Sequence, residues 1–225
     1  MDQQQTPTPP PAAPPTPPSP SRTSGVNIVD RAKNILITPK PEWEIIEKEK
    51  TNNVTIFTTY VLPFLLIGAF ASFIGFGFIG LQGIKFGAAQ GAIKGLIFVV
   101  STSILVFAMA AALDVLAPSF GSEKNWNKSF QLAAYSLTAA YLGAIFWLFP
   151  ALWILVLLCS LYSLYALYTG MPVLKKTPVD KQIAYFAVIL LVTVVLVILL
   201  NLLMNEIAKA FRPDPFAQYR RLLGQ

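Results

Sequence analysis

The chain has 225 residues, of which 55% are hydrophobic and only 12% are charged. Soluble domains carry about twice that charged fraction, so this composition favours a membrane protein. Histidine is absent and Cys159 is the single cysteine, which excludes His-based acid–base catalysis, a Ser-His-Asp triad, the common zinc sites and an intramolecular disulfide. The net charge of +6 comes from lysines and arginines spread over loops between apolar segments. Anionic lipid headgroups, rather than nucleic acid, are therefore the expected partner.

Residues 1–25 are predicted to form a disordered Pro-rich tail, because runs such as PTPPPAAPPTPP favour polyproline II and cannot bury a core. An alternative role is a ligand for a cytosolic protein with an aromatic groove, although Arg22 is the only basic residue close to the PxxP motifs. The first 20 residues lack the basic region and apolar core of a cleavable signal peptide. We therefore expect the first membrane span to direct insertion.

Residues 26–56 are predicted to form amphipathic, juxtamembrane helices. The segment VNIVDRAKNILI places mostly apolar residues on one helical face, which suits either the membrane interface or packing on the protein's own membrane domain. The following PKPEWEIIEKEK predicts a helix over 41–52, with Pro41 at its first position. Its Trp43 and Ile46 lie three residues apart and are placed to reach the headgroup region.

Five apolar segments follow, each close to the 20 or so helical residues that cross a bilayer. They are 57–80, 92–114, 130–149, 151–169 and 183–204. Lipid cannot satisfy open backbone groups, and the segments lack the alternation of a barrel strand. The prediction is an all-α membrane protein: a bundle of five transmembrane helices over 57–205, preceded by short juxtamembrane helices and followed by a short C-terminal tail at 206–225.

Lysine and arginine counts set the expected orientation. With five spans, the N-terminus shares a side with the second joint (117–128) and the fourth joint (170–182), and that side carries more of the basic residues near the membrane. The chain is therefore expected to be a multi-pass protein of the cytoplasmic membrane if bacterial, with a cytoplasmic N-terminus and a C-terminus on the opposite side.

The fourth joint and the helix before it hold the most distinctive segment, YSLYALYTGMPVLKKTPVDK at 162–181. Tyrosines three residues apart share one side of a helix leaving the bilayer, and Gly170 with Pro172 is predicted to end that helix. The lysines that follow load a short loop with positive charge. The candidate interaction or lipid-facing surface is Tyr165, Tyr168, Gly170, Pro172, Lys175, Lys176, Asp180 and Lys181. A helix-end turn with interfacial anchors explains the same residues equally well.

Two further features concern the spans. Gly83, Gly87, Gly91 and Gly95 recur every four residues, which lets helix backbones approach closely, either within the chain or in a homo-oligomer. Asp114 is the most notable polar residue inside a span. It is interpreted as an interfacial carboxylate near a helix end, or as an ion or proton site, with no obvious cationic partner in the other spans.

Three segments resemble one known family: LAPSFGSEKN at 116–125, AAYSLTAAYLGAIF at 133–146 and LYSLYALYTGMPVLKKTPVDKQIAYFAV at 161–188. They are similar to the Yip domain of Ypt/Rab-GTPase-interacting membrane proteins, and specifically to its bacterial branch, over roughly 26–205. The resemblance implies five spans, a cytoplasmic N-terminus and a short C-terminus across the membrane. It also implies no established enzymatic activity, no cofactor and no catalytic residues. The acidic DLYGP-like element that precedes the first span in many eukaryotic members, which are linked to Rab GTPases and vesicle traffic, is missing here.

The sequence therefore favours a non-enzymatic membrane protein that organises membrane or partners as an adaptor or scaffold. The alternative is a small-solute transporter or channel with a polar path through Asp114, Ser101, Ser103, Ser136 and Thr138. A membrane enzyme is the least supported class, because histidine and clustered carboxylates facing the membrane are lacking.

Overall fold

The computed structural model describes residues 27–80 and 87–210, and this part of the chain is helical with no β-strand. Two short helices, α1 (Ile28–Ile37) and α2 (Pro39–Lys48), precede five long apolar helical segments. Each of these five is long and apolar enough to cross a membrane. The predicted fold class, an all-α membrane protein with five spanning helices, is confirmed.

Each span is built from one or more helical elements in chain order. The first joins α3 (Asn53–Ile56), the π-helical η1 (Phe57–Val61), α4 (Leu62–Ile74) and the π-helical η2 (Gly75–Ile79). The second joins α5 (Ala88–Leu116) and the 3₁₀ turn η3 (Ala117–Phe120). The third joins α6 (Trp126–Ser136), α7 (Thr138–Gly143) and the 3₁₀ helix η4 (Ala144–Leu148). The fourth joins the 3₁₀ turn η5 (Pro150–Leu152) and α8 (Trp153–Leu174), and the fifth is α9 (Val179–Ala210).

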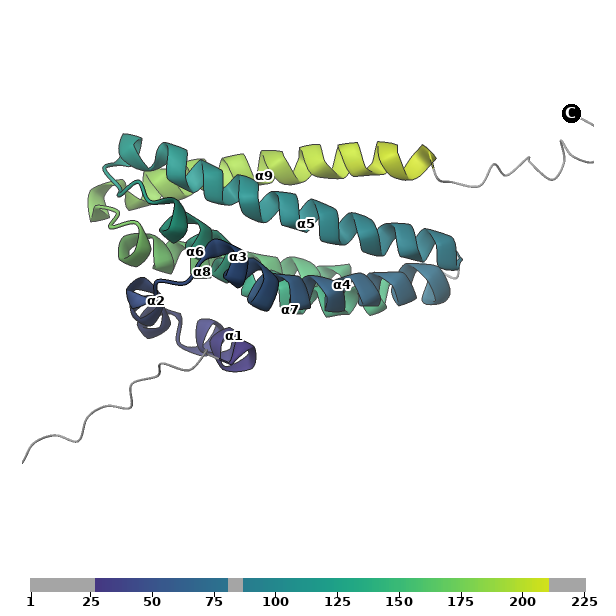
Figure 1. The fold of residues 1–225 in the computed structure, drawn as a ribbon. Helices are drawn as coiled ribbons and strands as arrows, with labels where there is room; N and C mark the ends of the chain where they lie inside the picture. Colours follow the sequence, from purple (N-terminus) through teal and green to yellow (C-terminus); the bar gives the residue numbers. More distant parts are fainter. Residues whose placement is uncertain (1–26, 81–86, 211–225) are drawn as a thin grey trace, which may run out of the picture.

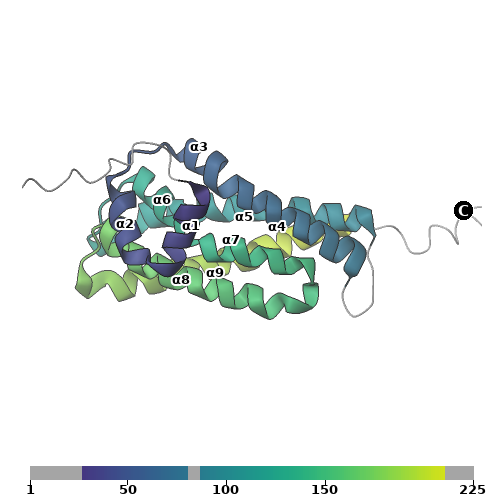
Figure 2. The same cartoon turned by 90° about the horizontal axis from the view of Figure 1, so that it is seen from below.

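The spans form an elongated bundle whose described first and last residues lie at opposite ends (Figures 1 and 2). α5 packs against α4, α6 and α9, while α8 packs against α6 and α7. The helices α1 and α2 lie at the same end as the joints α5–α6 and α8–α9 (Figure 1). The expected placement of the N-terminal region beside the second and fourth joints is thus seen in the fold.

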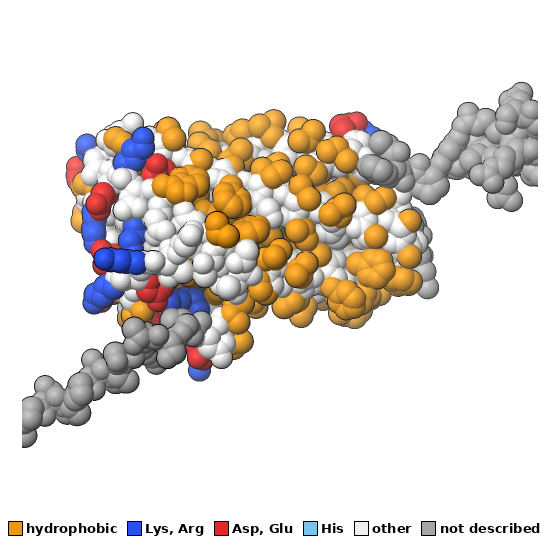
Figure 3. Space-filling model, in the orientation of Figure 1, with side chains coloured by type: hydrophobic (Ala, Val, Ile, Leu, Met, Phe, Trp, Pro, Cys, Tyr) orange, Lys and Arg blue, Asp and Glu red, His pale blue; other side chains and the backbone are white. Residues whose placement is uncertain are grey.

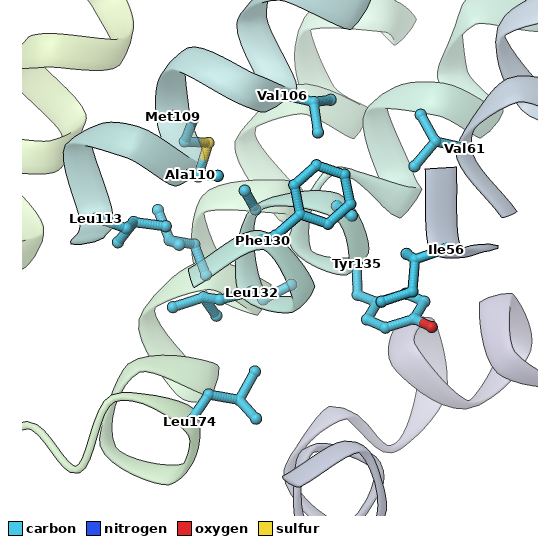
Figure 4. Packing of buried hydrophobic residues seen from close by; sticks show 14 of the residues in the cluster. Ile56, Val61, Val106, Met109, Ala110, Leu113, Phe130, Leu132, Tyr135 and Leu174 are labelled. Atoms are coloured by element: carbon cyan, nitrogen blue, oxygen red, sulfur yellow. The ribbon is translucent and has the colours of Figure 1, made fainter. Parts of the chain in front are cut away.

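The third span forms the centre of the bundle. Every residue of α6 from Ser129 to Ser136 is buried, and Figure 4 shows Phe130 among side chains from α5 and from the first span. The cluster around it includes Ile56, Val61, Val106, Met109, Leu113, Leu132, Tyr135 and Leu174. α9, in contrast, is the least buried span, which fits its nearly pure Val, Leu and Ile composition on a lipid-facing edge.

The small residues of the first two spans bring α4 and η2 close to α5. A Cβ added at Gly91 would lie 2.4 Å from the Phe73 carbonyl oxygen, and one added at Gly95 would lie 2.8 Å from the Ala69 carbonyl oxygen. Both glycines therefore serve packing within the chain. Gly87 instead caps the start of α5 with a φ of 85°, its backbone N–H donates to the Gly77 carbonyl at 3.1 Å, and a Cβ added there would meet no atom within 4 Å. Gly83 lies outside the described residues.

The bounds of α2 and the end of α8 differ from the prediction. α2 spans Pro39–Lys48 rather than 41–52: it begins at Pro39, which takes an early helical position where no backbone N–H is needed, and it ends four residues earlier than predicted. α8 does not end at Gly170 but runs through Pro172 to Leu174. Proline removes one helical hydrogen bond and leaves the Tyr168 carbonyl without its usual donor. The Gln182 side-chain Nε2 donates to that oxygen at 2.9 Å, which satisfies the freed carbonyl and lets the helix continue.

Candidate functional site

On the face shown in Figure 3, most of the charged side chains gather at one end of the bundle, a small group lies at the other end, and the long side between them is mostly apolar. We call the first of these ends the polar end: it comprises α1, α2, residues 121–125 of the second joint and residues 175–178 of the fourth joint. Several of the predicted interaction residues lie here or in the helices that lead to it. The structure divides them into residues that hold the end together and residues that point outward.

Lys175 lies inside the polar end rather than on its surface, with 0% of its area exposed. Its Nζ donates to Ser129 Oγ at 2.6 Å and lies 3.7 Å from Asp114 Oδ1, and Ser129 Oγ is 3.2 Å from the same carboxylate oxygen. Burial lowers the pKa of Lys175, and the Asp114 carboxylate opposes that change. The expectation that Lys175 contacts headgroups is therefore wrong, because the side chain binds within the protein.

Asp114 thus has a cationic partner, which the sequence did not indicate. The partner comes from the turn after α8 and not from another span, which is why a search of the spans alone missed it. Asp114 is itself only 9% exposed, so the pair ties the end of α5 to the start of α6 and the end of α8. Asp114 and Lys175, predicted separately as an intramembrane polar residue and a loop lysine, belong to one cluster.

The second and fourth joints are bound directly to each other. The Glu123 backbone N–H donates to the Lys175 carbonyl at 2.8 Å, and Ser122 Oγ donates to Thr177 Oγ1 at 2.9 Å. Between them Lys176 adopts a φ of 50°, and its Nζ lies 3.0 Å from Glu47 Oε1 of α2. The hydrogen bond from Lys176 lowers the pKa of Glu47. The turn therefore contacts both α2 and the second joint.

α2 is seated on α8 through Trp43. The indole ring is fully buried, its Nε1 donates to Thr169 Oγ1 at 3.2 Å, and a Cβ added at Gly170 would lie 2.8 Å from the ring. Gly170 is thus a packing surface for Trp43 and does not end the helix. Trp43 and Ile46, both expected to reach the headgroup region, are instead buried in the protein core.

Further polar contacts fix the two N-terminal helices. Arg31 of α1 bonds to Glu42 of α2 at 2.7 Å and to Glu49, and its guanidinium lies 5.5 Å from the ring centre of Tyr135 in α6. Lys128 of α6 donates to the carbonyl oxygens of Ile46, Glu47 and Glu49, which caps the C-terminal end of α2. α1 and α2 therefore pack on the protein's own membrane domain, one of the two arrangements that the sequence left open.

The remaining predicted residues face outward or sideways. Tyr165, Lys176, Asp180 and Lys181 are exposed. Tyr168 is half-buried and packs edge to face on Phe186 of α9, with ring centres 5.3 Å apart. Pro172 is half-buried within α8. The predicted surface is thus made of Lys176, Asp180 and Lys181 at the turn, with Tyr165 further along α8.

A polar groove of about 520 Å³ opens at the polar end, between the C-terminal end of α2 and the start of α6. It is lined by residues 47–52 together with Asn125, Asn127 and Lys128. Asn127 Nδ2 donates to the Thr51 carbonyl at 2.8 Å, and Lys128 is held by the α2 carbonyls, so much of the lining is already bonded within the protein. In the described part of the chain, no three His, Cys, Asp or Glu residues gather as a metal site would require.

The comparison with protein families agrees with this architecture. A family model described as the Yip1 domain matches residues 33–202. The match spans about three quarters of the chain and includes all five apolar helices, in whole or in large part. The chain belongs to the Yip1 domain family, a family not known for enzymatic activity. No match was found among curated proteins or among solved structures.

Several residues that build the site were not predicted from the sequence. Ser129 and Gln182 bind partners that are distant in the chain, and neither has a neighbouring motif that indicates this. Arg31 was missed as well, because its burial depends on the carboxylate of Glu42, which lies eleven residues on in the next helix.

Proposed function

We propose that this Yip1-family membrane protein is a non-enzymatic adaptor or scaffold whose polar end faces the cytoplasm and binds partner proteins. The main observation in support is that α1 and α2 are fixed to α6 and α8 by Trp43, Arg31 and Lys128. This packing presents a preformed charged surface on the bundle. Surfaces that are ordered before binding avoid part of the entropic cost of association.

The outer surface of the polar end carries both signs of charge, which favours a protein partner with complementary charges. The exposed charged residues on the polar end and directly beside it are Asp30, Lys33, Lys40, Glu44, Lys48, Lys50, Glu123, Lys124, Lys176, Asp180 and Lys181. The buried polar groups beneath them are largely bonded to each other. They supply rigidity, while the exposed groups remain accessible to a partner, including Lys176, which pairs with Glu47. A cytoplasmic location for this end follows from the greater number of lysines near the membrane on this side.

The test is proximity crosslinking from native membranes with three forms of the protein. The intact chain is compared with a variant lacking residues 1–24, which lie outside the described residues, and with the charge-reversal variant Lys48→Glu/Lys124→Glu. A discrete set of partners that is retained without residues 1–24 but lost on charge reversal supports the polar end as the binding surface. If partners are lost only from the variant that lacks residues 1–24, recruitment is assigned to that segment. A partner set unchanged in both variants contradicts the proposal.

Contact of the 170–182 turn with anionic lipid is also a proposal, now limited to Lys176 and Lys181. Lys181 is exposed, and Lys176 is exposed although it pairs with Glu47. The variant Lys176→Glu/Lys181→Glu should retain less anionic lipid in native mass spectrometry. Unchanged lipid retention would overturn this contact.

A transport role has less support from the same contacts. Asp114 is paired with Lys175, and the hydroxyls of Ser101, Ser103 and Ser136 donate to carbonyls of their own helices. The Thr138 hydroxyl lies within hydrogen-bonding distance of the Tyr135 carbonyl at the end of α6 and of the Tyr60 hydroxyl. Each of these groups thus makes its own local bond, and together they do not line a continuous polar path across the membrane. If Asp114→Asn altered solute flux in liposomes without loss of folding, transport would become the better proposal.

A further inference from the structure

The polar groove between α2 and α6 has more unpaired positive charge than negative charge. Its lining includes two carboxylates, and each is paired with a cation that does not belong to the lining. Glu47 Oε1 lies 3.0 Å from Lys176 Nζ, and Glu49 Oε1 is bonded to Arg31. An anion that enters the groove therefore meets carboxylates whose charge is already balanced within the protein.

Two lysines of the lining, in contrast, are unpaired. Lys48 and Lys50 are exposed, and neither forms an ion pair with another described residue. Lys128 is the third cation of the lining, and its ammonium is bonded to carbonyl oxygens at the end of α2. The positive charges that remain for a ligand are thus those of Lys48 and Lys50, at the end of α2 and in the segment that follows it.

The segment between α2 and α3 adds hydrogen-bond donors. Glu49 and Asn52 have extended backbones, with ψ of 137° and 142°. The backbone N–H groups of Lys50, Thr51 and Asn52 donate to no oxygen in the described part of the chain. Asn52 and Asn125 use their side-chain oxygens to cap α3 and α6, while their Nδ2 groups bond to no described residue. The groove therefore offers donors and two cations, which suit a ligand that supplies anionic oxygen atoms.

We propose that this groove binds a carboxylate-rich, extended peptide segment of a cytosolic partner protein, with Lys48 and Lys50 paired to its acidic side chains. The groove volume of about 520 Å³ lies within the range of about 300–1,000 Å³ that is typical of ligand sites, which is more than a single ion needs. Most of the lining, residues 47–52 and Asn125, precedes the first and third spans, so a peptide reaches it from the aqueous side.

The charges around the groove favour a protein over a lipid headgroup. The exposed carboxylates of Glu44 in α2 and Glu123 in the second joint belong to the same polar end. They oppose contact with a flat anionic membrane surface, whereas a folded partner can place basic groups against them. The partner is thus expected to carry acidic residues for the groove and basic residues around them.

The test is a fluorescence-anisotropy titration of the intact protein in nanodiscs of phosphatidylcholine alone, with fluorescein-labelled hexaglutamate as the probe and hexaglutamine as the uncharged comparison. Asn125→Asp places a carboxylate in the groove and keeps the oxygen that caps α6. Its matched control, Asn27→Asp, makes the same change at the cap of α1, outside the lining. Hexaglutamate should bind the wild type and Asn27→Asp, and Asn125→Asp should weaken binding by at least about tenfold.

A second pair of variants removes positive charge instead of adding negative charge. Lys48→Gln/Lys50→Gln should weaken hexaglutamate binding, because it removes both unpaired charges of the lining. Lys33→Gln/Lys40→Gln removes the same charge from exposed positions of the polar end that do not line the groove, and should retain binding. Equal weakening in the two double variants would show general attraction to the polar end and overturn the site.

Three further outcomes would overturn the peptide site. They are the absence of hexaglutamate binding to the wild type, equal binding by Asn125→Asp and Asn27→Asp, and binding of hexaglutamine as tight as that of hexaglutamate. Soluble glycerophosphoglycerol, the headgroup of phosphatidylglycerol, distinguishes the lipid alternative. Displacement of hexaglutamate by an equal concentration of this competitor would assign the groove to lipid headgroups and contradict a peptide site. Apparent melting temperatures identify any variant whose loss of binding reflects misfolding.

The groove site rests on the proposed adaptor function, but the two fail separately. Binding of hexaglutamate at the groove without a discrete partner set in native membranes would retain the peptide site and contradict the adaptor role. A partner set that is lost in Lys48→Glu/Lys124→Glu but retained in Asn125→Asp would support the adaptor role and overturn the groove as the place where partners bind.

Discussion

At the scale of single residues, the cluster of Lys175, Ser129 and Asp114 is the most consequential polar feature. An ammonium group without solvent contact is costly unless a carboxylate and a hydroxyl compensate it, and both lie within 4 Å of Nζ here. A pair of this kind gives little net stability compared with apolar residues of the same size. Removing one partner, however, leaves the other charge buried alone. The cluster joins the end of α5, the start of α6 and the end of α8, so it favours the packing in which these three helix ends meet.

The first prediction follows from this asymmetry. Lys175→Met and Asp114→Asn should each destabilise the protein, by as much as about 3–5 kcal/mol, because each leaves one buried charge without a partner. The double variant should recover much of that loss, since no unpaired charge remains. Unfolding by denaturant in detergent micelles measures all three. Additive losses in the double variant would show that the two groups do not interact.

The second prediction concerns the contact of Trp43 with Gly170. Gly170→Ala places a methyl group 2.8 Å from the indole and 2.6 Å from Leu132 Cδ1, so the two helices must separate, at a cost of about 1–3 kcal/mol. Thr169→Val keeps the shape and removes only the hydrogen-bond acceptor of Trp43, so its cost should be nearer 1 kcal/mol. Hydrogen exchange across residues 39–48 should rise in Gly170→Ala and rise less in Thr169→Val. The reverse order would contradict the packing role of Gly170.

At the scale of elements, glycine spacing positions the first two spans. The third prediction is that Gly91→Ala lowers the apparent melting temperature, because its Cβ would meet the Phe73 backbone oxygen, which cannot move away as a flexible side chain would. Ala92→Leu, one residue on and exposed, is the matched control and should have little effect. Equal melting temperatures for Gly91→Ala and wild type would mean that α4 and α5 are not closely packed at this position.

Helix type and number could be predicted because each span is encoded by its own apolar residues, without reference to any partner. The residues at which helices end could not be predicted in the same way, because they depend on tertiary contacts that are not visible in the sequence. α8 passes Pro172 because Gln182, ten residues later and in another helix, supplies the missing donor. In the same way, the buried side of α1 includes Arg31 because Glu42 and Glu49 neutralise it. An apolar pattern alone would place that arginine on the surface.

The candidate site was predicted only in part, because the roles of its residues also depend on contacts with distant parts of the chain. The segment 162–181 identifies the turn that joins α2 to the second joint, and Gly170, Lys175 and Lys176 all make contacts there. Their roles could not be assigned, since Trp43 is 127 positions before Gly170 and Ser129 is 46 before Lys175. Lysines in a membrane-proximal loop are usually taken to face lipid. Only the three-dimensional arrangement shows which of them is buried.

At the scale of the whole molecule, an odd number of spans separates the two described ends of the chain. The second and fourth joints lie with α1 and α2, and the α7–α8 joint lies at the other end (Figures 1 and 2). Lysines bias the first of these ends toward the cytoplasm. The orientation of the bundle in its membrane therefore decides whether the polar end can meet cytosolic proteins.

The fourth prediction tests that orientation with single cysteines in a Cys159→Ala background, which has no other thiol. Lys124→Cys places a thiol in the second joint and Ala151→Cys places one in the α7–α8 joint, and both positions are exposed. In sealed membrane vesicles with the cytoplasmic side inward, a membrane-impermeant maleimide should label Ala151→Cys at once. It should label Lys124→Cys only after the vesicles are opened, because that joint would lie on the cytoplasmic side. The opposite pattern would place the polar end outside the cytoplasm and remove the basis for a cytosolic partner. Labelling of both positions from one side would contradict the five-span arrangement itself.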